Sequence, residues 1–92
     1  MKILTKNILF ILTLCLCTLF LQAQQSKVDS LLVNLSKSKE DTNKINLLNE
    51  LSYEYWDINP NDGLKYAKQA LLLSEKLKSK AGMAESYSNI SR

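Results

Sequence analysis

The sequence predicts an all-α protein, because its composition and its apolar spacing both favour helices over strands. The 92 residues include one proline and two glycines, which leaves few of the turns that an all-β fold needs. After residue 24, Val and Ile are scarce, whereas the helix formers Leu, Lys, Glu and Ala are abundant. Apolar residues also recur with helical spacing in each segment of this part. We therefore expect antiparallel helix hairpins and no sheet.

Residues 1–23 have the three-part layout of a secretory signal peptide. Lys2 and Lys6 form a basic start, an apolar run of 14 residues covers 8–21, and Ala23 offers a small residue at the cleavage position. As a helix the run is about 21 Å long, too short to span a hydrocarbon core of about 30 Å comfortably. We expect cleavage after Ala23. The mature chain is then periplasmic or secreted, with no membrane attachment.

The apolar run has two other interpretations. The run could stay in place as an uncleaved signal anchor, and this alternative remains open. It could also be a lipoprotein signal, with Cys15 or Cys17 acylated. That signal needs a small residue before the cysteine, but Leu14 and Leu16 stand there. The two cysteines are therefore better explained as apolar filler of the signal.

The composition after residue 23 excludes several classes of chemistry. This part contains neither histidine nor cysteine, which removes the usual zinc and iron ligands and the usual serine or cysteine nucleophile systems. Its two isolated glycines form no phosphate-binding loop. Its ten basic and nine acidic residues nearly cancel, so charge gives no argument for nucleic acid. The sequence predicts a protein that is not an enzyme and uses no cofactor or metal.

Four segments of this part carry an apolar stripe with helical spacing, at about 26–38, 42–56, 60–79 and 81–90. Asp41 is the expected N-cap of the second, and Asn59 that of the third, with Pro60 at its first position. Gly82 marks a turn or a loose start of the fourth helix, whose expected apolar face carries Ala84, Tyr87 and Ile90. Residues 24–41 then form a lead-in helix and linker, and 42–92 the main helical part.

An internal repeat links the second and fourth segments at an offset of 39 residues. It aligns four positions of one helix with four of the other: Ile45, Leu48, Leu51 and Ser52 with Ala84, Tyr87, Ile90 and Ser91. A fixed offset in this range between helix–turn–helix units is typical of an α-solenoid.

Residues 43–92 resemble the tetratricopeptide repeat family. The residues that carry the resemblance are Leu51, Ser52 and Tyr55 on one helix, and Gly63, Leu64, Lys65, Tyr66, Ala67, Ala70 and Leu71 on the next. The sequence departs from the family pattern at Ser52, where glycine is commonest, at Gly63, where alanine is commonest, and in its offset, which exceeds the usual 34. The resemblance implies that the small residues let paired helices pack closely, as the start of a solenoid. It makes Leu51, Ser52, Tyr55, Gly63, Tyr66, Ala67 and Ala70 repeat-packing positions.

The resemblance also implies recognition of a protein or peptide partner. Tyr53 and Trp56 lie off the main apolar stripe, so they are candidates to contact that partner, with packing between repeats as the equal alternative. About one and a half repeats are present, which predicts a truncated array or, failing that, a homodimer. The alternative function is the periplasmic input region of a membrane histidine kinase or transcription regulator, with its effector domain beyond residue 92.

Overall fold

A computed structural model describes the backbone of residues 2–92 and the side chains of residues 7–14 and 25–92. The chain forms four helices in this part, α1 (Lys2–Lys37), α2 (Thr42–Tyr55), α3 (Pro60–Lys76) and α4 (Lys80–Ile90). Residues 2–92 contain no strand. The helices pack against one another, so the predicted all-α fold is confirmed.

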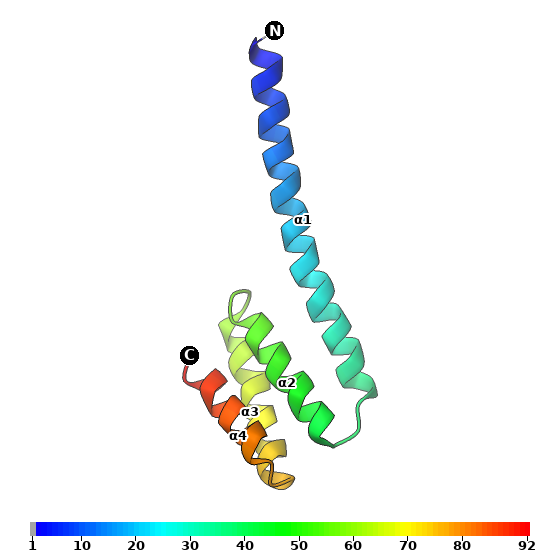
Figure 1. The fold of residues 1–92 in the computed structure, drawn as a ribbon, viewed down its shortest axis with the longest axis vertical. Helices are drawn as coiled ribbons and strands as arrows, with labels where there is room; N and C mark the ends of the chain where they lie inside the picture. The colour runs from blue at the N-terminus through cyan, green and yellow to red at the C-terminus, as the bar shows by residue number, and fades with distance from the viewer. Residues whose placement is uncertain (1) are drawn as a thin grey trace.

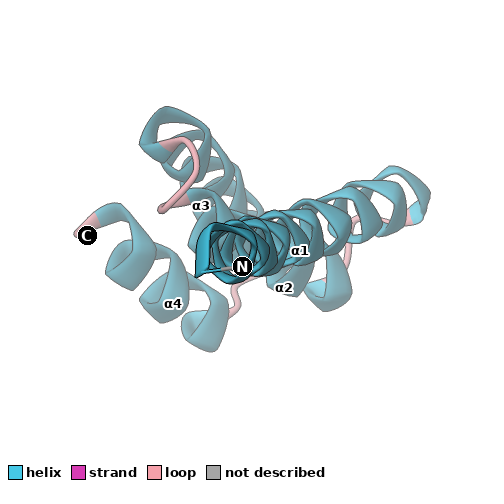
Figure 2. Cartoon of the chain, turned by 90° about the horizontal axis from the view of Figure 1, so that it is seen from above, coloured by secondary structure: helices cyan, strands magenta, loops and turns pink. Residues whose placement is uncertain are grey.

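Helices α2, α3 and α4 form a bundle in which each helix runs antiparallel to the one before it (Figure 1). Helix α1 is much longer, and only its C-terminal part runs beside α2, while its N-terminal part projects away from the bundle. Seen from above, α3 and α4 lie to one side of the projecting end of α1 (Figure 2). Helix α2 contacts each of the other three helices.

The lead-in helix expected at residues 26–38 is the C-terminal end of α1, which starts at Lys2. The helix is continuous because no proline or glycine interrupts it between Lys2 and Lys37. It therefore runs through the expected cleavage position without a break. The side chains of Lys2, Lys6, Cys15, Cys17 and Ala23, on which the signal-peptide prediction rests, lie outside the described side chains.

The projecting part of α1 exposes large apolar side chains. Six of them are more than half exposed: Ile8, Leu9, Phe10, Ile11, Leu12 and Leu14. Among the described side chains, packing of α1 on the bundle starts with Lys27 and Val28. No helix among the described residues is both long enough and apolar enough to cross a membrane.

The two N-caps expected from the sequence form as predicted. The Asp41 carboxylate accepts a hydrogen bond from the Lys44 N–H at 3.2 Å, and α2 starts at the next residue, Thr42. The Asn59 side-chain oxygen accepts from the Asp62 N–H at 3.4 Å, and Pro60 occupies the first helical position. Both side chains satisfy N–H groups that have no partner inside the helix, which fixes where α2 and α3 begin.

The corner between α3 and α4 differs from the prediction. Helix α3 ends at Lys76, three residues before the expected end, because the Ser79 N–H bonds back to the Ser74 carbonyl at 2.8 Å and Lys78 turns left-handed with a φ of 56°. Ser79 then caps α4, since its hydroxyl accepts from the Gly82 N–H at 3.1 Å. Gly82 is therefore a buried residue inside α4 and not a turn.

The core lies where α2 faces α1 and α3. One cluster joins Ile45 and Leu48 of α2 to Ala70 and Leu73 of α3, and a second joins Val28 and Leu31 of α1 to Leu51 of α2. Leu35 and Tyr66 are partly buried and pack against both clusters. Burial of each large aliphatic side chain contributes about 1.5–3 kcal/mol, so this shared core accounts for the position of α1 on the bundle.

The packed face of α4 is not the one that the sequence predicted. Ala84 and Tyr87 are exposed and Ile90 is half-buried, whereas Gly82, Ser86 and Asn89 are buried. Small and polar residues occupy this face because α4 approaches its neighbours closely and because hydrogen bonds satisfy its polar groups. The expected apolar face of α4 is wrong, and it points largely to solvent.

Enlarging Gly82 is expected to destabilise the bundle. A Cβ atom at this position would lie 2.5 Å from the Ser74 Oγ atom and 2.8 Å from the Ile45 Cγ2 atom. Gly82→Leu should therefore lower the free energy of unfolding by about 1–3 kcal/mol, the usual cost of overpacking. Urea unfolding measures this loss. The matched control, Ala84→Leu on the exposed side of α4, should change stability by less than about 0.5 kcal/mol. Equal losses in the two variants would contradict the packing of α4.

Stability is also expected to fall at alkaline pH through Tyr55. Burial, with the neighbouring Tyr66 as a second cause, raises the pKa of Tyr55 above its ordinary value of about 10. The folded chain then holds this proton more tightly than the unfolded chain, so the stabilisation is present below about pH 10 and is lost as the pH rises through the folded pKa. Urea midpoints at about pH 8 and about pH 11 measure the fall. The loss of stability between these two pH values should be smaller in Tyr55→Phe. An equal loss in this variant would exclude Tyr55 as the cause.

Candidate functional site

The structure places the seven predicted repeat-packing residues inside the bundle. Leu51, Ser52, Ala67 and Ala70 are fully buried, Gly63 is buried, and Tyr55 and Tyr66 are half-buried. The Ser52 hydroxyl donates to the Gly63 carbonyl at 2.7 Å, and the rings of Tyr55 and Tyr66 stack with their centroids 5.5 Å apart. A Cβ atom on Gly63 would lie 3.2 Å from the Ser52 carbonyl oxygen, so a small residue is needed where α2 meets α3.

Tyr53 and Trp56, the two predicted partner-binding residues, lie in different environments. Tyr53 is 53% exposed, and the Arg92 guanidinium lies over its ring, 4.4 Å from the centroid. Such a cation–π contact at an exposed site contributes about 0.5–1 kcal/mol. Tyr53 therefore presents an exposed aromatic ring at the point where α2 contacts Arg92.

Trp56 instead links α2 to α4. It is half-buried, and its indole N–H donates to the Asn89 carbonyl at 3.1 Å. Asn89 lies in the last turn of α4, where carbonyl groups have no partner inside the helix. Packing between repeats was the alternative role predicted for Trp56, and this hydrogen bond joins it to α4.

An ion pair extends the surface around Tyr53 onto α1. The Lys27 ammonium lies 2.9 Å from a carboxylate oxygen of Glu54 on α2. Its hydrogen bond to Glu54 and the charge of that carboxylate raise the pKa of Lys27, and Glu50 and Tyr53 contribute in the same direction. We call Lys27, Glu50, Tyr53, Glu54 and Arg92 the three-helix face. It combines side chains from α1 and α2 with that of Arg92, the second residue after α4.

Beneath this face lies a buried polar cluster that the sequence analysis missed. The Asn49 side-chain oxygen accepts from the Asn89 amide at 3.2 Å and lies 3.1 Å from the Ser86 hydroxyl, which also donates to the Gly82 carbonyl at 2.7 Å. The Asn89 amide also donates to the Asn49 backbone carbonyl at 3.3 Å. A sequence signal for it exists: Gly82, Ser86 and Asn89 are spaced 4 and 3, which is helical, but their small and polar character hid the pattern.

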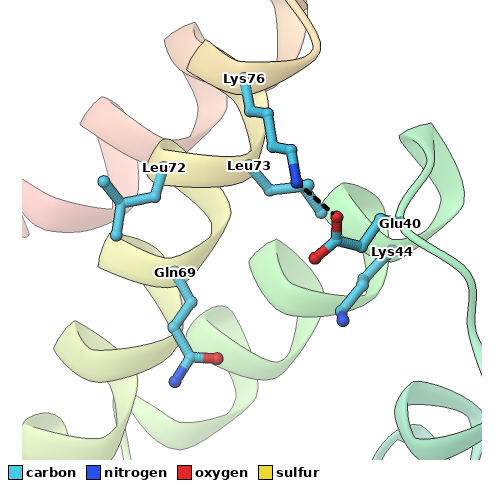
Figure 3. A pocket seen from close by; sticks show the side chains of 6 residues that line it. All are labelled: Glu40, Lys44, Gln69, Leu72, Leu73 and Lys76. Carbon is cyan, nitrogen blue, oxygen red and sulfur yellow. Dashed lines mark hydrogen bonds and ion pairs between the residues drawn. The ribbon is translucent and has the colours of Figure 1, made fainter.

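A separate groove lies near the other end of the bundle, between the start of α2 and the end of α3. It has a volume of about 260 Å³ and is lined by six residues that Figure 3 shows around it: Glu40, Lys44, Gln69, Leu72, Leu73 and Lys76. The Lys76 ammonium lies 2.7 Å from a Glu40 carboxylate oxygen. This hydrogen bond, the charge of Lys76 and more weakly that of Lys44 lower the pKa of Glu40.

These two surfaces offer non-covalent contacts: an aromatic ring, a guanidinium, ion-paired side chains and an apolar floor. No group of three or more His, Cys, Asp or Glu side chains that could hold a metal ion occurs among the described residues. Of the two surfaces, the three-helix face gathers the predicted residue Tyr53, whereas the groove contains none of the predicted site residues.

Comparisons of the chain with protein-family models, curated proteins and solved structures give no match. The resemblance to tetratricopeptide repeats therefore rests on the residues quoted above and on their positions in the bundle. It stays a prediction.

The contact between Trp56 and Asn89 is expected to stabilise the end of α4. Trp56→Phe removes the indole N–H and leaves the Asn89 carbonyl without this partner, so the free energy of unfolding should fall by about 0.5–1.5 kcal/mol. Urea unfolding followed by far-UV circular dichroism measures it, because Trp56 is the one tryptophan of the chain. Tyr53→Phe, which keeps the exposed ring, is the control and should be neutral. A neutral Trp56→Phe would show that the hydrogen bond contributes nothing.

Proposed function

We propose that the chain is an exported helical-repeat scaffold of tetratricopeptide type that binds a protein or peptide through the three-helix face. The observation that carries this proposal is the exposed Tyr53 ring, held under Arg92 and flanked by the ion pair between Lys27 and Glu54. Tyrosine and arginine are among the residue types that dominate binding energy at protein interfaces. Here Tyr53 on α2 and Arg92, beyond the end of α4, come together.

The arrangement of this face favours recognition for a second reason, which is that its side chains contact one another before a partner binds. Arg92 holds one side of the Tyr53 ring, and Lys27 fixes Glu54. A binding surface ordered before contact loses less conformational entropy when the partner arrives, by about 0.5–1.5 kcal/mol for each side chain that would otherwise be immobilised. The polar cluster below it, centred on Asn49, keeps α2 and α4 in a fixed register.

Export is supported by the basic start, the apolar run and Ala23 in the sequence. It is also supported by the part of α1 that contacts the bundle. The described side chains of residues 7–14 are exposed and contribute nothing to the two core clusters. Contacts between α1 and the bundle start with Lys27 and Val28. Cleavage after Ala23 would therefore leave these contacts in the mature chain.

Photo-crosslinking in the organism that encodes the chain tests this function. The full chain carries p-benzoylphenylalanine in place of Tyr53, and mass spectrometry identifies both its N-terminus and its crosslinked products. We expect a processed chain that starts at Gln24, outside the cytoplasm, joined to one dominant protein. The same photoreactive residue at Val33, which is 52% exposed on α1 but outside the three-helix face, is the matched control and should not capture that protein.

Binding of the captured protein to purified variants then gives the second readout. Tyr53→Ala and Arg92→Ala should each weaken binding about fivefold or more, as expected for residues near the centre of an interface. Tyr87→Ala removes an equally exposed tyrosine from α4 and should leave the affinity unchanged. Equal capture from positions 53 and 33, or an unprocessed chain confined to the cytoplasm, would exclude the proposed function.

A further inference from the structure

The groove between the start of α2 and the end of α3 has an apolar floor and a positive rim. Leu72 is 67% exposed there, and Leu73 lies beside it. Of the three charged residues that line it, Glu40 and Lys76 pair with each other, while Lys44 makes no ion pair among the described residues. In the described part of the chain, the groove therefore carries one cation outside an ion pair, Lys44 on its α2 side, and Figure 3 shows Leu72 and Leu73 on its α3 side. A complementary ligand has an apolar group next to a carboxylate.

The size of the groove selects a single side chain over a small molecule. Its volume of about 260 Å³ lies below the range of about 300–1,000 Å³ that is typical of small-molecule sites. One branched aliphatic side chain fits within this space and would lie against the exposed Leu72. The neighbouring carboxylate then reaches the rim, and the Gln69 amide can bond to a peptide group.

The chain itself carries such a group at the turn between α2 and α3. Ile58 is 45% exposed there, next to the exposed Asp57. Two hydrogen bonds to the Tyr55 carbonyl, from the N–H groups of Ile58 at 3.0 Å and Asn59 at 2.7 Å, hold the turn. We call Asp57 and Ile58 the tip. Other exposed apolar residues fit less well: Tyr53 lies under Arg92 and its neighbour Glu54 pairs with Lys27, and lysines flank Leu77.

The tip cannot reach the groove of its own molecule. Lys44 lies near the start of α2, whereas Ile58 follows the end of this helix at Tyr55, and the 11 residues from Lys44 to Tyr55 alone correspond to about 16 Å of helix. Figure 1 shows the turn between α2 and α3 at one end of the bundle and the turn before α2 at the other. A contact between tip and groove must therefore join two copies of the chain.

We propose that the tip of one copy docks in the groove of a second copy, with Ile58 on Leu72 and Leu73 and the Asp57 carboxylate at the Lys44 ammonium. Because the two surfaces differ and lie at opposite ends, the association is head-to-tail, and a pair of copies keeps one free groove on the first copy and one free tip on the second. Neither the tip nor the groove contains a residue of the three-helix face, so this association goes beyond the proposed function and is tested separately from it.

Crosslinking between isotopically distinct copies tests the proposal on the full purified chain. Equal amounts of ¹⁴N and ¹⁵N protein, both with p-benzoylphenylalanine at position 58, are irradiated, and mixed-isotope crosslinked peptides are mapped. We expect them to join position 58 to the groove segments 40–44 and 69–76. Asp57→Lys and Lys44→Glu should each lower the yield about fivefold, as loss of one surface ion pair does. A mixture of Asp57→Lys chains with Lys44→Glu chains should restore it, because a tip lysine then meets a groove glutamate.

Lys68→Glu is the matched charge control, since Lys68 is an exposed lysine of α3 outside the groove, and it should leave the yield unchanged. Far-UV circular dichroism of each variant establishes that the helices are retained. The proposal is overturned if the mixed-isotope crosslinks map to the exposed apolar residues 7–14 of α1, if only crosslinks within one copy form, or if the charge reversals have no effect and do not rescue each other.

Discussion

The burial of α2 on three sides is the constraint on which the rest of the structure depends. This helix contacts α1, α3 and α4, and its residues Ile45, Leu48, Leu51 and Ser52 are among the most buried of the described chain. Three neighbours can surround one helix only if some of them approach closely. Gly63 on α3 and Gly82 on α4 provide this approach, because a Cβ atom at either position would press on α2.

Close approach also explains why polar groups line the contact between α2 and α4. Asn49, Ser86 and Asn89 are almost fully buried, and an amide or hydroxyl without a partner there would cost about 1–3 kcal/mol. Their mutual hydrogen bonds offset most of this cost, although the Asn49 side-chain nitrogen has no partner among the described groups. Since these bonds form in only one alignment of the two helices, the cluster fixes the register of α4 where an apolar contact would tolerate sliding.

Much of the fold could be predicted from the sequence because it depends on local chemistry. Asp41 and Asn59 each cap the helix that follows, and this requires only a side-chain oxygen near the first free N–H groups. Close packing at small residues such as Ser52 and Gly63 was instead implied by the resemblance to tetratricopeptide repeats. The face that α4 buries could not be predicted in this way. Hydrophobic spacing predicts that Tyr87 and Ile90 are buried. The buried residues are instead Ser86 and Asn89, which hydrogen-bond to Asn49.

The candidate site was less predictable, because it depends on residues distant in the sequence. Tyr53 was identified from its place off the apolar stripe, but nothing local indicates that Arg92 covers its ring or that Lys27 pairs with Glu54, 27 residues further on. The groove was missed for the same reason, since its residues come from 40–44 and 69–76 and no single helix shows it. To predict a surface that forms between helices, the packing of α2 against its neighbours must be known first.

In the proposed function, the position of Lys27 would connect export with recognition. In a mature chain that starts at Gln24, Lys27 would lie in the first turn of α1, where the helix dipole disfavours a positive charge by about 0.3–1 kcal/mol. The Glu54 carboxylate at 2.9 Å offsets this cost from the neighbouring helix. The ion pair would then stabilise the new N-terminal end of α1 after the preceding turns are removed. It would also keep Lys27 in its place in the three-helix face. One contact between α1 and α2 would thus preserve, after cleavage, the surface that the proposed function uses.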